Sequence, residues 1–327
     1  MGSKNKILGS IWQHLGKLEF ESFLDVFAGS NVVGYFMKCQ NKRVISNDFL
    51  TFSYLNAKAI IENPSVQLSD QDIQILLKYN ENDNFIQSTF KDVFFSEEDN
   101  KFLDFVRFNI SLFENEYKKA LAYSSLVRAC LKKRSRGIFT FVGERYNDGR
   151  VDMQKSIQDH FLESISLYNN AVFDNNKTNK ALNLNSEDIQ LNTDLVYLDP
   201  PYYSPKSDND YVRRYHFVEG LVKNWDNLKI QEHTAVKKFK SYDTPFSKKT
   251  SSAIALDNLM NKFKNSIIVI SYSSNSLPKK EEIIEMLSKY KSNIQTHEIK
   301  HTYSMGNQNH KIGNANNRIQ EYLFIGK

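Results

Sequence analysis

The pattern of apolar and polar residues predicts strands near both ends of the chain. The stretch "FLDVFAGSNVVGYF" at 23–36 predicts a short buried strand, a glycine-containing turn and the start of a helix. A second strand, "RVISNDF" at 43–49, follows closely. This order of strand, turn, helix and strand is typical of the opening of a doubly wound α/β sheet, whose ligands bind at the carboxyl ends of the strands.

Helical periodicity replaces the strands from about residue 51 to 136. Two stretches in this region, "LSDQDIQIL" at 68–76 and "FSEEDNKFLDF" at 95–105, each place a serine and then acidic residues where a helix would begin. A crossover between neighbouring strands of an α/β sheet needs far fewer residues than this region contains. The region is therefore predicted to be an inserted helical subdomain.

Strands return near Leu182. They are predicted at "DLVYLD" (194–199), at "NSIIVISYSS" (265–274) and in a terminal hairpin that ends in "RIQEYLFIG" (318–326). One α/β sheet split by a helical insertion explains this order better than two domains in series.

Composition narrows the class of protein without identifying its ligand. With 327 residues, 40% of them hydrophobic, the chain can bury a large core, and no apolar run is long enough to cross a bilayer. The N-terminus lacks the apolar core of a signal peptide, and Cys39 and Cys130 lack the spacing of a disulfide framework or a metal site. A cytoplasmic protein without a metal is expected. The formal charge of +5 favours a polyanionic partner but is too small to identify one.

The turn "DVFAGSNVVG" at 25–34 suits a close approach of the backbone to a ligand at Gly29. It is not GxGxxG, and the chain has no GKS or GKT, so neither dinucleotide nor nucleoside triphosphate binding is indicated. Asp48 ends the next strand and could accept hydrogen bonds from both hydroxyls of a ribose, which favours an adenosine-bearing cofactor without phosphates. The alternative is that Gly29 and Gly34 only turn the chain and that Asp48 caps a helix.

The stretch "LVYLDPPYYSP" at 195–205 is the most specific motif in the chain. Pro200 and Pro201 fix the backbone after Asp199 and leave its carbonyl groups as acceptors. The Asp199 carboxylate and the Pro200 carbonyl could accept both hydrogens of an exocyclic amino group, while the Tyr202 ring could stack on a base. Such acceptors would make the lone pair of an aromatic amine available to an electrophile, which suits a flipped adenine. The alternative is a Pro-Pro turn after a buried strand.

These motifs, in this order, resemble those of the DNA adenine-N6 methyltransferases of the Dam-like class, which depend on S-adenosylmethionine. The resemblance covers nearly the whole chain. "GSKNKIL" is similar to the family's N-terminal motif, "DVFAGSNVVGYF" to its glycine-turn motif, "SNDF" to its ribose-binding motif and "DLVYLDPPYY" to its catalytic motif. "SDNDYVRRYHFVEGL", "IIVISYSSNSLP" and "NRIQEYLFIG" look like later segments in one branch of the family.

The resemblance implies a Rossmann-like class I methyltransferase sheet with a helical target-recognition insertion. It assigns residues 1–50 and 181–327 to the S-adenosylmethionine-binding catalytic domain, and 51–180 to the DNA-recognition insertion. "FAGSN" has one glycine where most members have two, and "ALNLNSEDIQ" lacks the usual aspartate that contacts the cofactor's adenine, so Asn185 or Asp188 is expected to take its place. The residues implied to bind the cofactor are Lys4 (near its methionine end), Asp25, Phe27, Gly29, Asp48, Phe49, Asp188 and Asp199.

The reaction implied is methyl transfer to adenine N6 in a short target of double-stranded DNA, as in restriction-modification systems or phages. The implied catalytic residues are Asp199, Pro200, Pro201 and Tyr202. Asp199 and Pro200 would orient the amine, and Tyr202 would stack on the extruded base. A cognate restriction endonuclease is a second candidate partner. The alternatives are an RNA or protein-glutamine N-methyltransferase, although glutamine-modifying enzymes have Asn in place of Asp199, and a silent DNA-binding subunit, although such subunits usually lose residues of this motif.

Basic residues in and after the insertion are candidates for DNA contacts. The run "LKKRSR" at 131–136 and the arginine pair in "DYVRRYHF" would contact phosphates, and "GERYNDGR" would present arginine to base edges. The alternatives are a solvated face, a surface pair on a helix and a hydrogen-bonded turn, respectively. Tyr215 and His216 are expected to pack or hydrogen-bond locally. The DNA-binding candidates are Lys132, Lys133, Arg134, Arg136, Arg145, Arg150, Arg213 and Arg214.

Overall fold

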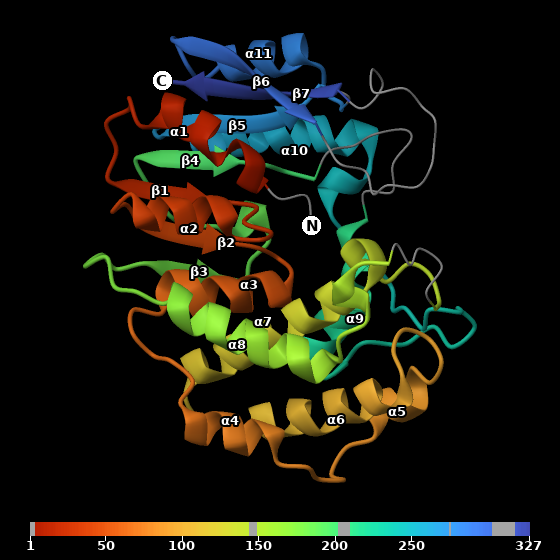
Figure 1. Ribbon diagram of the computed structural model, residues 1–327. Helices are drawn as coiled ribbons and strands as arrows, with labels where there is room; N and C mark the ends of the chain where they lie inside the picture. Colours follow the sequence, from red (N-terminus) through yellow and green to blue (C-terminus); the bar gives the residue numbers. More distant parts are fainter. Residues whose placement is uncertain (1–3, 144–148, 202–209, 275, 303–317) are drawn as a thin grey trace. The chain divides into compact units, whose positions relative to one another are not determined.

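Seven strands of the described chain form one mixed sheet (Figure 1). They are β1 (Ser22–Asp25), β2 (Arg43–Asn47), β3 (Lys180–Leu182), β4 (Leu195–Leu198), β5 (Ile267–Ser273), β6 (Ile294–Thr302) and β7 (Arg318–Gly326). Their order is β3-β2-β1-β4-β5-β7-β6; the first five are parallel, and β7 runs antiparallel between β5 and β6. The predicted α/β sheet is confirmed, including its antiparallel terminal pair, whereas the three-residue strand β3 is an addition.

The computed structural model describes residues 4–143, 149–201, 210–274, 276–302 and 318–327. The chain divides into two units. Residues 1–49, 175–209 and 243–327 form the sheet unit, and residues 50–174 and 210–242 form the helical unit. Residues 210–242, which the motif resemblance places in the catalytic domain, therefore group with the helices of the insertion.

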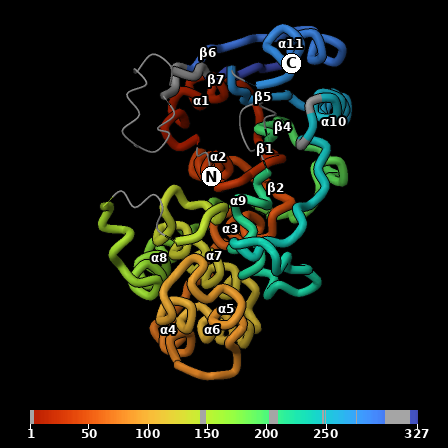
Figure 2. Tube along the Cα trace, turned by 90° about the vertical axis from the view of Figure 1, so that its right-hand side faces the viewer, coloured from red at the N-terminus to blue at the C-terminus, as the bar shows by residue number. Residues whose placement is uncertain are grey.

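Helices cover both faces of the sheet, which explains why its parallel strands are continuously apolar. α1 (Leu8–Leu15) and α2 (Val32–Cys39) lie on one face, and α10 (Lys249–Lys262) and α11 (Lys280–Ser288) lie on the other (Figure 1, Figure 2). On this second face, Leu259 and Ile283 pack with Val196 and Ile268 in a buried core. The sheet unit also has short 3₁₀ helices at Lys4–Ile7, Ser186–Asp188 and Pro245–Ser247.

The helical unit follows the periodicity of its sequence. Its helices are α3 (Thr51–Ala57), α4 (Asp70–Leu77), α5 (Phe85–Thr89), α6 (Glu97–Ser111), α7 (Glu116–Lys133), α8 (Ile157–Ala171) and α9 (Tyr211–Val222), with a π-helical turn at Lys58–Glu62 and 3₁₀ turns at Ser135–Gly137 and Val151–Met153. Ser69 and Ser96 cap α4 and α6, each accepting a hydrogen bond from the backbone amide three residues on. Both serine starts predicted from the sequence are thus confirmed.

No helix in the part of the chain that the structure describes is both long and apolar enough to cross a membrane. Even α7, with 18 residues, carries charged side chains along its length, among them Lys118 and Arg128.

Candidate active site

The ends of three neighbouring strands bring carboxylates together. β1 ends at Asp25, while Asp48 follows β2 and Asp199 follows β4; β1 lies between the other two strands and is parallel to both. Asp25 is 2% exposed, and its Oδ1 has no hydrogen-bond partner among the described residues. Burial, reinforced by the charges of Asp199 and Asp48, raises the pKa of Asp25 well above its ordinary value. This edge of the sheet therefore suits a cationic ligand.

Lys4 places a buried positive charge beside the carboxylate of the catalytic motif. It is 6% exposed, and its Nζ lies 3.2 Å from Asp199 Oδ1. The same Nζ pairs with Glu321 on β7, which is fully buried and accepts a hydrogen bond of 2.7 Å from Ser271 Oγ on β5. The ammonium thus lies between two carboxylates. Lys4 is a predicted site residue, whereas Glu321 and Ser271 have no predicted role.

The turn after β1 is fixed to the end of β2. Gly29 has a positive φ of 51°, which glycine adopts without strain, and its amide donates a hydrogen bond of 2.7 Å to Asp48 Oδ2. Phe27, in the same turn, packs edge to face against Phe246 with ring centroids 5.2 Å apart. The predicted turn residue and the predicted acidic residue are therefore neighbours.

Two asparagines tie together the loops that follow β1, β2 and β3. Asn47 Nδ2 donates to the carbonyls of Val26 and Leu184 at 3.0 and 3.1 Å, and Asn47 Oδ1 accepts from the Leu184 amide at 3.1 Å. Asn183 Nδ2 donates to the Asp48 carbonyl at 2.8 Å. Neither residue is predicted from the sequence. The signal for Asn47 was its short polar side chain at the end of an apolar strand, directly before Asp48.

The other residues expected to bind the cofactor lie in the loops that follow β2 and β3. Phe49 is half-buried directly after Asp48, and Asn185 and Asp188 are exposed. Asn185 Nδ2 donates to Asp188 Oδ2 at 3.2 Å, so the two alternatives for the adenine contact belong to one turn.

The catalytic motif is described as far as its second proline. The Asp199 side chain is 20% exposed, Pro200 is buried and Pro201 is half-buried. The rigid acidic start of the motif therefore stands at the carboxyl end of β4, next to Lys4. Tyr202 lies outside the described residues.

One histidine spacing in the sheet unit is typical of helical metal ligands. His297 and His301 are four residues apart, but they lie on strand β6, where that spacing separates them by about 13 Å. His297 instead stacks on His14, with ring centroids 3.7 Å apart.

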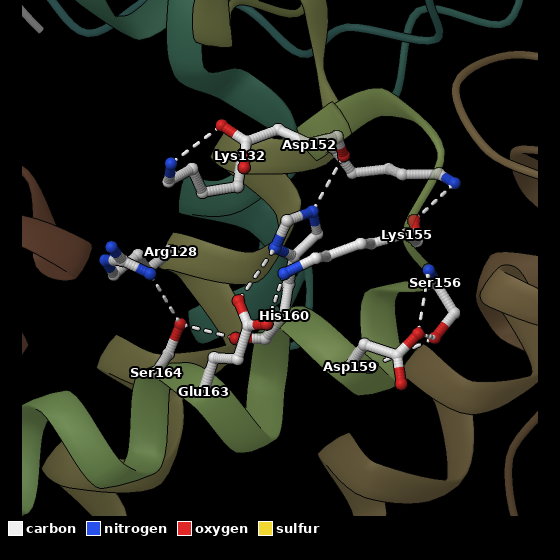
Figure 3. A network of polar contacts seen from close by, with 10 residues as sticks. Arg128, Lys132, Asp152, Lys155, Ser156, Asp159, His160, Glu163 and Ser164 are labelled. Carbon is white, nitrogen blue, oxygen red and sulfur yellow. Dashed lines mark hydrogen bonds and ion pairs between the residues drawn. The ribbon is translucent and has the colours of Figure 1, made fainter. Parts of the chain in front are cut away.

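Figure 3 shows the polar contacts around the basic run at the end of α7. Lys132 Nζ pairs with Asp152 Oδ2 at 2.7 Å, and its side chain keeps 38% of its surface exposed. Lys133 Nζ donates to the Lys155 carbonyl at 2.6 Å. Both lysines therefore have partners within the helical unit that a DNA phosphate would have to replace.

Arg134 differs from its neighbours in the run. It is 2% exposed, and its guanidinium donates to the carbonyls of Phe141 at 2.7 Å and Gly143 at 2.9 Å. It also lies 4.5 Å from the centroid of the Phe141 ring. The buried guanidinium anchors the segment 138–143, which corrects the expectation of a phosphate contact for this residue.

The remaining basic candidates belong to the same unit. Phe139, in the anchored segment, donates its amide to the Arg214 carbonyl at 2.9 Å, so this segment lies beside α9. Arg214 is half-buried, and Arg145 lies outside the described residues. The exposed candidates are Arg136, Arg150 and Arg213.

His216 has the local role expected for it. It is buried on α9, and its Nε2 contacts the Phe139 carbonyl at 3.0 Å. Burial lowers the pKa of His216 to about 4. A neutral imidazole that holds the anchored segment fits both observations.

The chain matches the family model of the D12 class N6 adenine-specific DNA methyltransferases over residues 1–305. It belongs to this family. The resemblance of its motifs is thereby confirmed, and with it the Rossmann-like fold and the adenine-specific DNA methyltransferase activity. Such an enzyme requires a methyl donor of the S-adenosylmethionine type.

Similar proteins carry related names. The Type II methyltransferase M2.HphI of Haemophilus parahaemolyticus is 28% identical, and the match covers 99% of this chain and 96% of that protein. Modification methylase StsI of Streptococcus sanguinis is 28% identical, over 89% of this chain and 46% of the relative. The Type II methyltransferase M.FokI of Planomicrobium okeanokoites is 26% identical, and the match covers 99% of this chain and 52% of that protein. The D12-class enzyme thus spans nearly all of the first relative and about half of the other two.

Proposed function

We propose that this D12-class enzyme transfers the methyl group of S-adenosylmethionine to N6 of an adenine in a short target of duplex DNA, with Asp199 at the centre of the site. The observation that carries this proposal is the convergence of Asp25, Asp48 and Asp199 at neighbouring strand ends, beside the buried Lys4. Family membership supports the reaction, and this convergence supports its proposed location.

The residues of the sheet unit fit the cofactor. One oxygen of Asp48 holds the Gly29 amide, and a carboxylate has further lone pairs with which to accept hydrogen bonds from a ribose. A cation near Asp25 would offset the cost of burying its carboxylate, which suits the sulfonium and the amino group of the methionine end. When bound, the cofactor supplies an electrophilic methyl group on a sulfonium sulfur. Phe27, Phe49 and either Asn185 or Asp188 would surround its adenosine.

Asp199 would orient the substrate amine. Its carboxylate and the carbonyl of Pro200 would accept the two hydrogens of N6, while Tyr202 would stack on the base. Acceptors placed in this way draw the nitrogen toward tetrahedral geometry and make its lone pair available for attack. Lys4 Nζ, 3.2 Å from Asp199 Oδ1, stabilises the negative charge of that carboxylate.

The helical unit would bind the DNA. Lys132 and Lys133 would exchange their present partners for phosphates. Breaking the partly exposed pair of Lys132 with Asp152 costs little, because exposed ion pairs contribute only about 0–1 kcal/mol. Arg134 would act indirectly, by anchoring the segment 138–143 that precedes Arg145 and Arg150. The other candidates for phosphate contacts are Arg136, Arg213 and Arg214.

A restriction-modification role is the biological context that we favour. The similar proteins are named type II methyltransferases and modification methylases. The D12-class enzyme would then protect its target from a cognate endonuclease. Sequencing of methylated bases in a host that expresses it would identify both the modified atom and the target.

Asp199→Asn tests the proposed site. The variant keeps the size of the side chain but loses its charge and presents a donor to the amine. We expect methyl transfer from labelled cofactor to fall at least about a thousandfold, because lost orientation and lost electrostatic stabilisation combine.

The matched control is Asp104→Asn, which alters a fully buried carboxylate of the helical unit that caps α5 through the amides of Ile86 and Gln87. Its activity should match that of the unaltered enzyme at temperatures where it is folded. DNA retention should persist in both variants, since phosphate contacts supply most of it. Substantial turnover by Asp199→Asn would assign the chemistry to another residue.

A further inference from the structure

A carboxylate with no assigned part in the reaction lies behind Lys4. Glu321 is fully buried on β7 and accepts a hydrogen bond of 2.7 Å from Ser271 Oγ, and Lys4 Nζ pairs with both Glu321 and Asp199. In the register of β5 and β7, Ser271 stands opposite Leu323, so Ser271 and Glu321 are diagonal neighbours on one face of the strand pair. Ser271, Glu321 and Lys4 thus form a chain of polar contacts that ends at Asp199.

The fold alone does not explain an ion at this position. Removing an ammonium and a carboxylate from water costs several kcal/mol per ion, and apolar side chains of similar volume often stabilise a core equally well. Further along β7, Leu323 and Phe324 are apolar and fully buried, so this strand packs well without charge. A function at the neighbouring site is the simplest reason for the ion pair.

We infer that Glu321, supported by Ser271, is a positioning residue for methyl transfer, because it holds the Lys4 ammonium in one place beside Asp199 Oδ1. An ammonium group has three donors on a flexible stem, so with one carboxylate partner it could move around that partner. A second carboxylate restricts the ammonium and, through it, the orientation of Asp199. This inference rests on the proposed role of Asp199 in orienting the substrate amine.

Glu321→Gln removes the charge and keeps the shape and one acceptor oxygen. We expect kcat to fall by about 10- to 100-fold, because displacement of reacting groups can cost about a hundredfold. KM for DNA and for S-adenosylmethionine should stay within about threefold, because Glu321 is expected to act on the transition state and not on binding. Equal kcat in the variant and the unaltered enzyme would overturn the inference, as would a loss confined to KM.

Ser271→Ala is the milder variant and keeps the test valid if Glu321→Gln folds poorly. It removes only the hydrogen bond to Glu321, so kcat should fall by about threefold to tenfold. The matched control is again Asp104→Asn, which removes a buried carboxylate charge elsewhere. Thermal melting of all three variants separates lost stability from lost positioning, and a kcat loss in the control as large as that in Glu321→Gln would overturn the inference.

A direct measurement on Lys4 needs no catalysis. Reductive dimethylation followed by peptide mass spectrometry should label Lys4 slowly in the unaltered enzyme and at least about tenfold faster in Glu321→Gln, because the ammonium loses one of its two carboxylates. Unchanged labelling would overturn the inference. Faster labelling in Glu321→Gln together with an active Asp199→Asn would instead show that Lys4 is held by Glu321 while the proposed role of Asp199 fails.

Discussion

Lys4 in the sheet unit and Arg134 in the helical unit are both buried cations, but their partners differ in kind. Lys4 lies between the carboxylates of Asp199 and Glu321, and Asp25 is near enough to Asp199 for their charges to interact. Arg134 donates to backbone carbonyls of one neighbouring segment and lies over aromatic rings. The partners described for Lys4 carry charge, whereas those described for Arg134 are neutral carbonyls and rings.

The difference shows what each cation does. Carbonyl partners make Arg134 a structural anchor, since a guanidinium with five donors in a fixed fork can hold several carbonyls of one segment in place. Carboxylate partners make Lys4 part of a charge balance that a cationic ligand or a substrate amine would change. Between these two cations, the kind of partner therefore separates the proposed catalytic role from the structural one.

Replacing each cation by methionine gives the largest effects. Lys4→Met leaves two carboxylates facing each other, so the free energy of unfolding should fall by about 3 to 5 kcal/mol and methyl transfer by at least about a hundredfold. Arg134→Met leaves carbonyls unpaired, at a cost of about 1 to 3 kcal/mol, and should weaken DNA binding while cofactor affinity is unchanged. Urea unfolding and calorimetric titration measure both. Loss of cofactor affinity in Arg134→Met would contradict the assignment of Arg134 to a role in the helical unit alone.

Stability against pH should separate the two regions next. The pKa of Asp25 is raised in the folded enzyme, so the native state binds more protons than the unfolded state above the ordinary value of 3.8. The free energy of unfolding should therefore decrease as pH rises from that value through the raised pKa of Asp25. In Asp25→Asn this decrease should be smaller, as measured by urea unfolding between pH 5 and 9. Arg134→Met, which leaves Asp25 and the other carboxylates at the strand ends unaltered, should keep the slope of the unaltered enzyme.

The smallest expected effect distinguishes Arg134 from the rest of its run. Replacing Lys132, Lys133 and Arg136 together by glutamine should lower DNA affinity and flatten its salt dependence, by about 0.9 in slope for each phosphate that is no longer neutralised. The preferred target should stay the same, because phosphate contacts carry no sequence information. Filter binding at several salt concentrations measures the slope. If the slope of DNA affinity against salt is unchanged, these three residues make no phosphate contacts.

Much of the sheet unit follows from local sequence signals. The strands at 22–25, 43–47, 195–198 and 267–273 coincide with apolar runs, and the residues after them follow a motif order that also predicts which side chains meet. The contact between Gly29 and Asp48 is an example, because strands β1 and β2 are adjacent and parallel. β3 has only three residues, too few for a pattern to indicate it.

The parts that could not be predicted depend on contacts between distant residues. The run "LKKRSR" has the same charge pattern whether Arg134 is solvated or buried, and contacts with distant carbonyls, among them those of the segment 138–143, accompany its burial. The grouping of 210–242 with the helical unit depends on pairs such as Glu219 with the amides of Thr51 and Phe52. Glu321 stands in a strand whose pattern predicts burial but not a partner.

Lys4 and Glu321 are 317 positions apart in the sequence and yet form one ion pair. During synthesis, Lys4 leaves the ribosome long before β7 does. The strand that holds the ammonium is therefore translated after all of the helices that carry the candidate DNA contacts. A chain terminated just before β7 would keep those basic residues and lack the anchor beside Asp199. The order of translation thus delays the pairing of Lys4 with Glu321 until β7 has emerged.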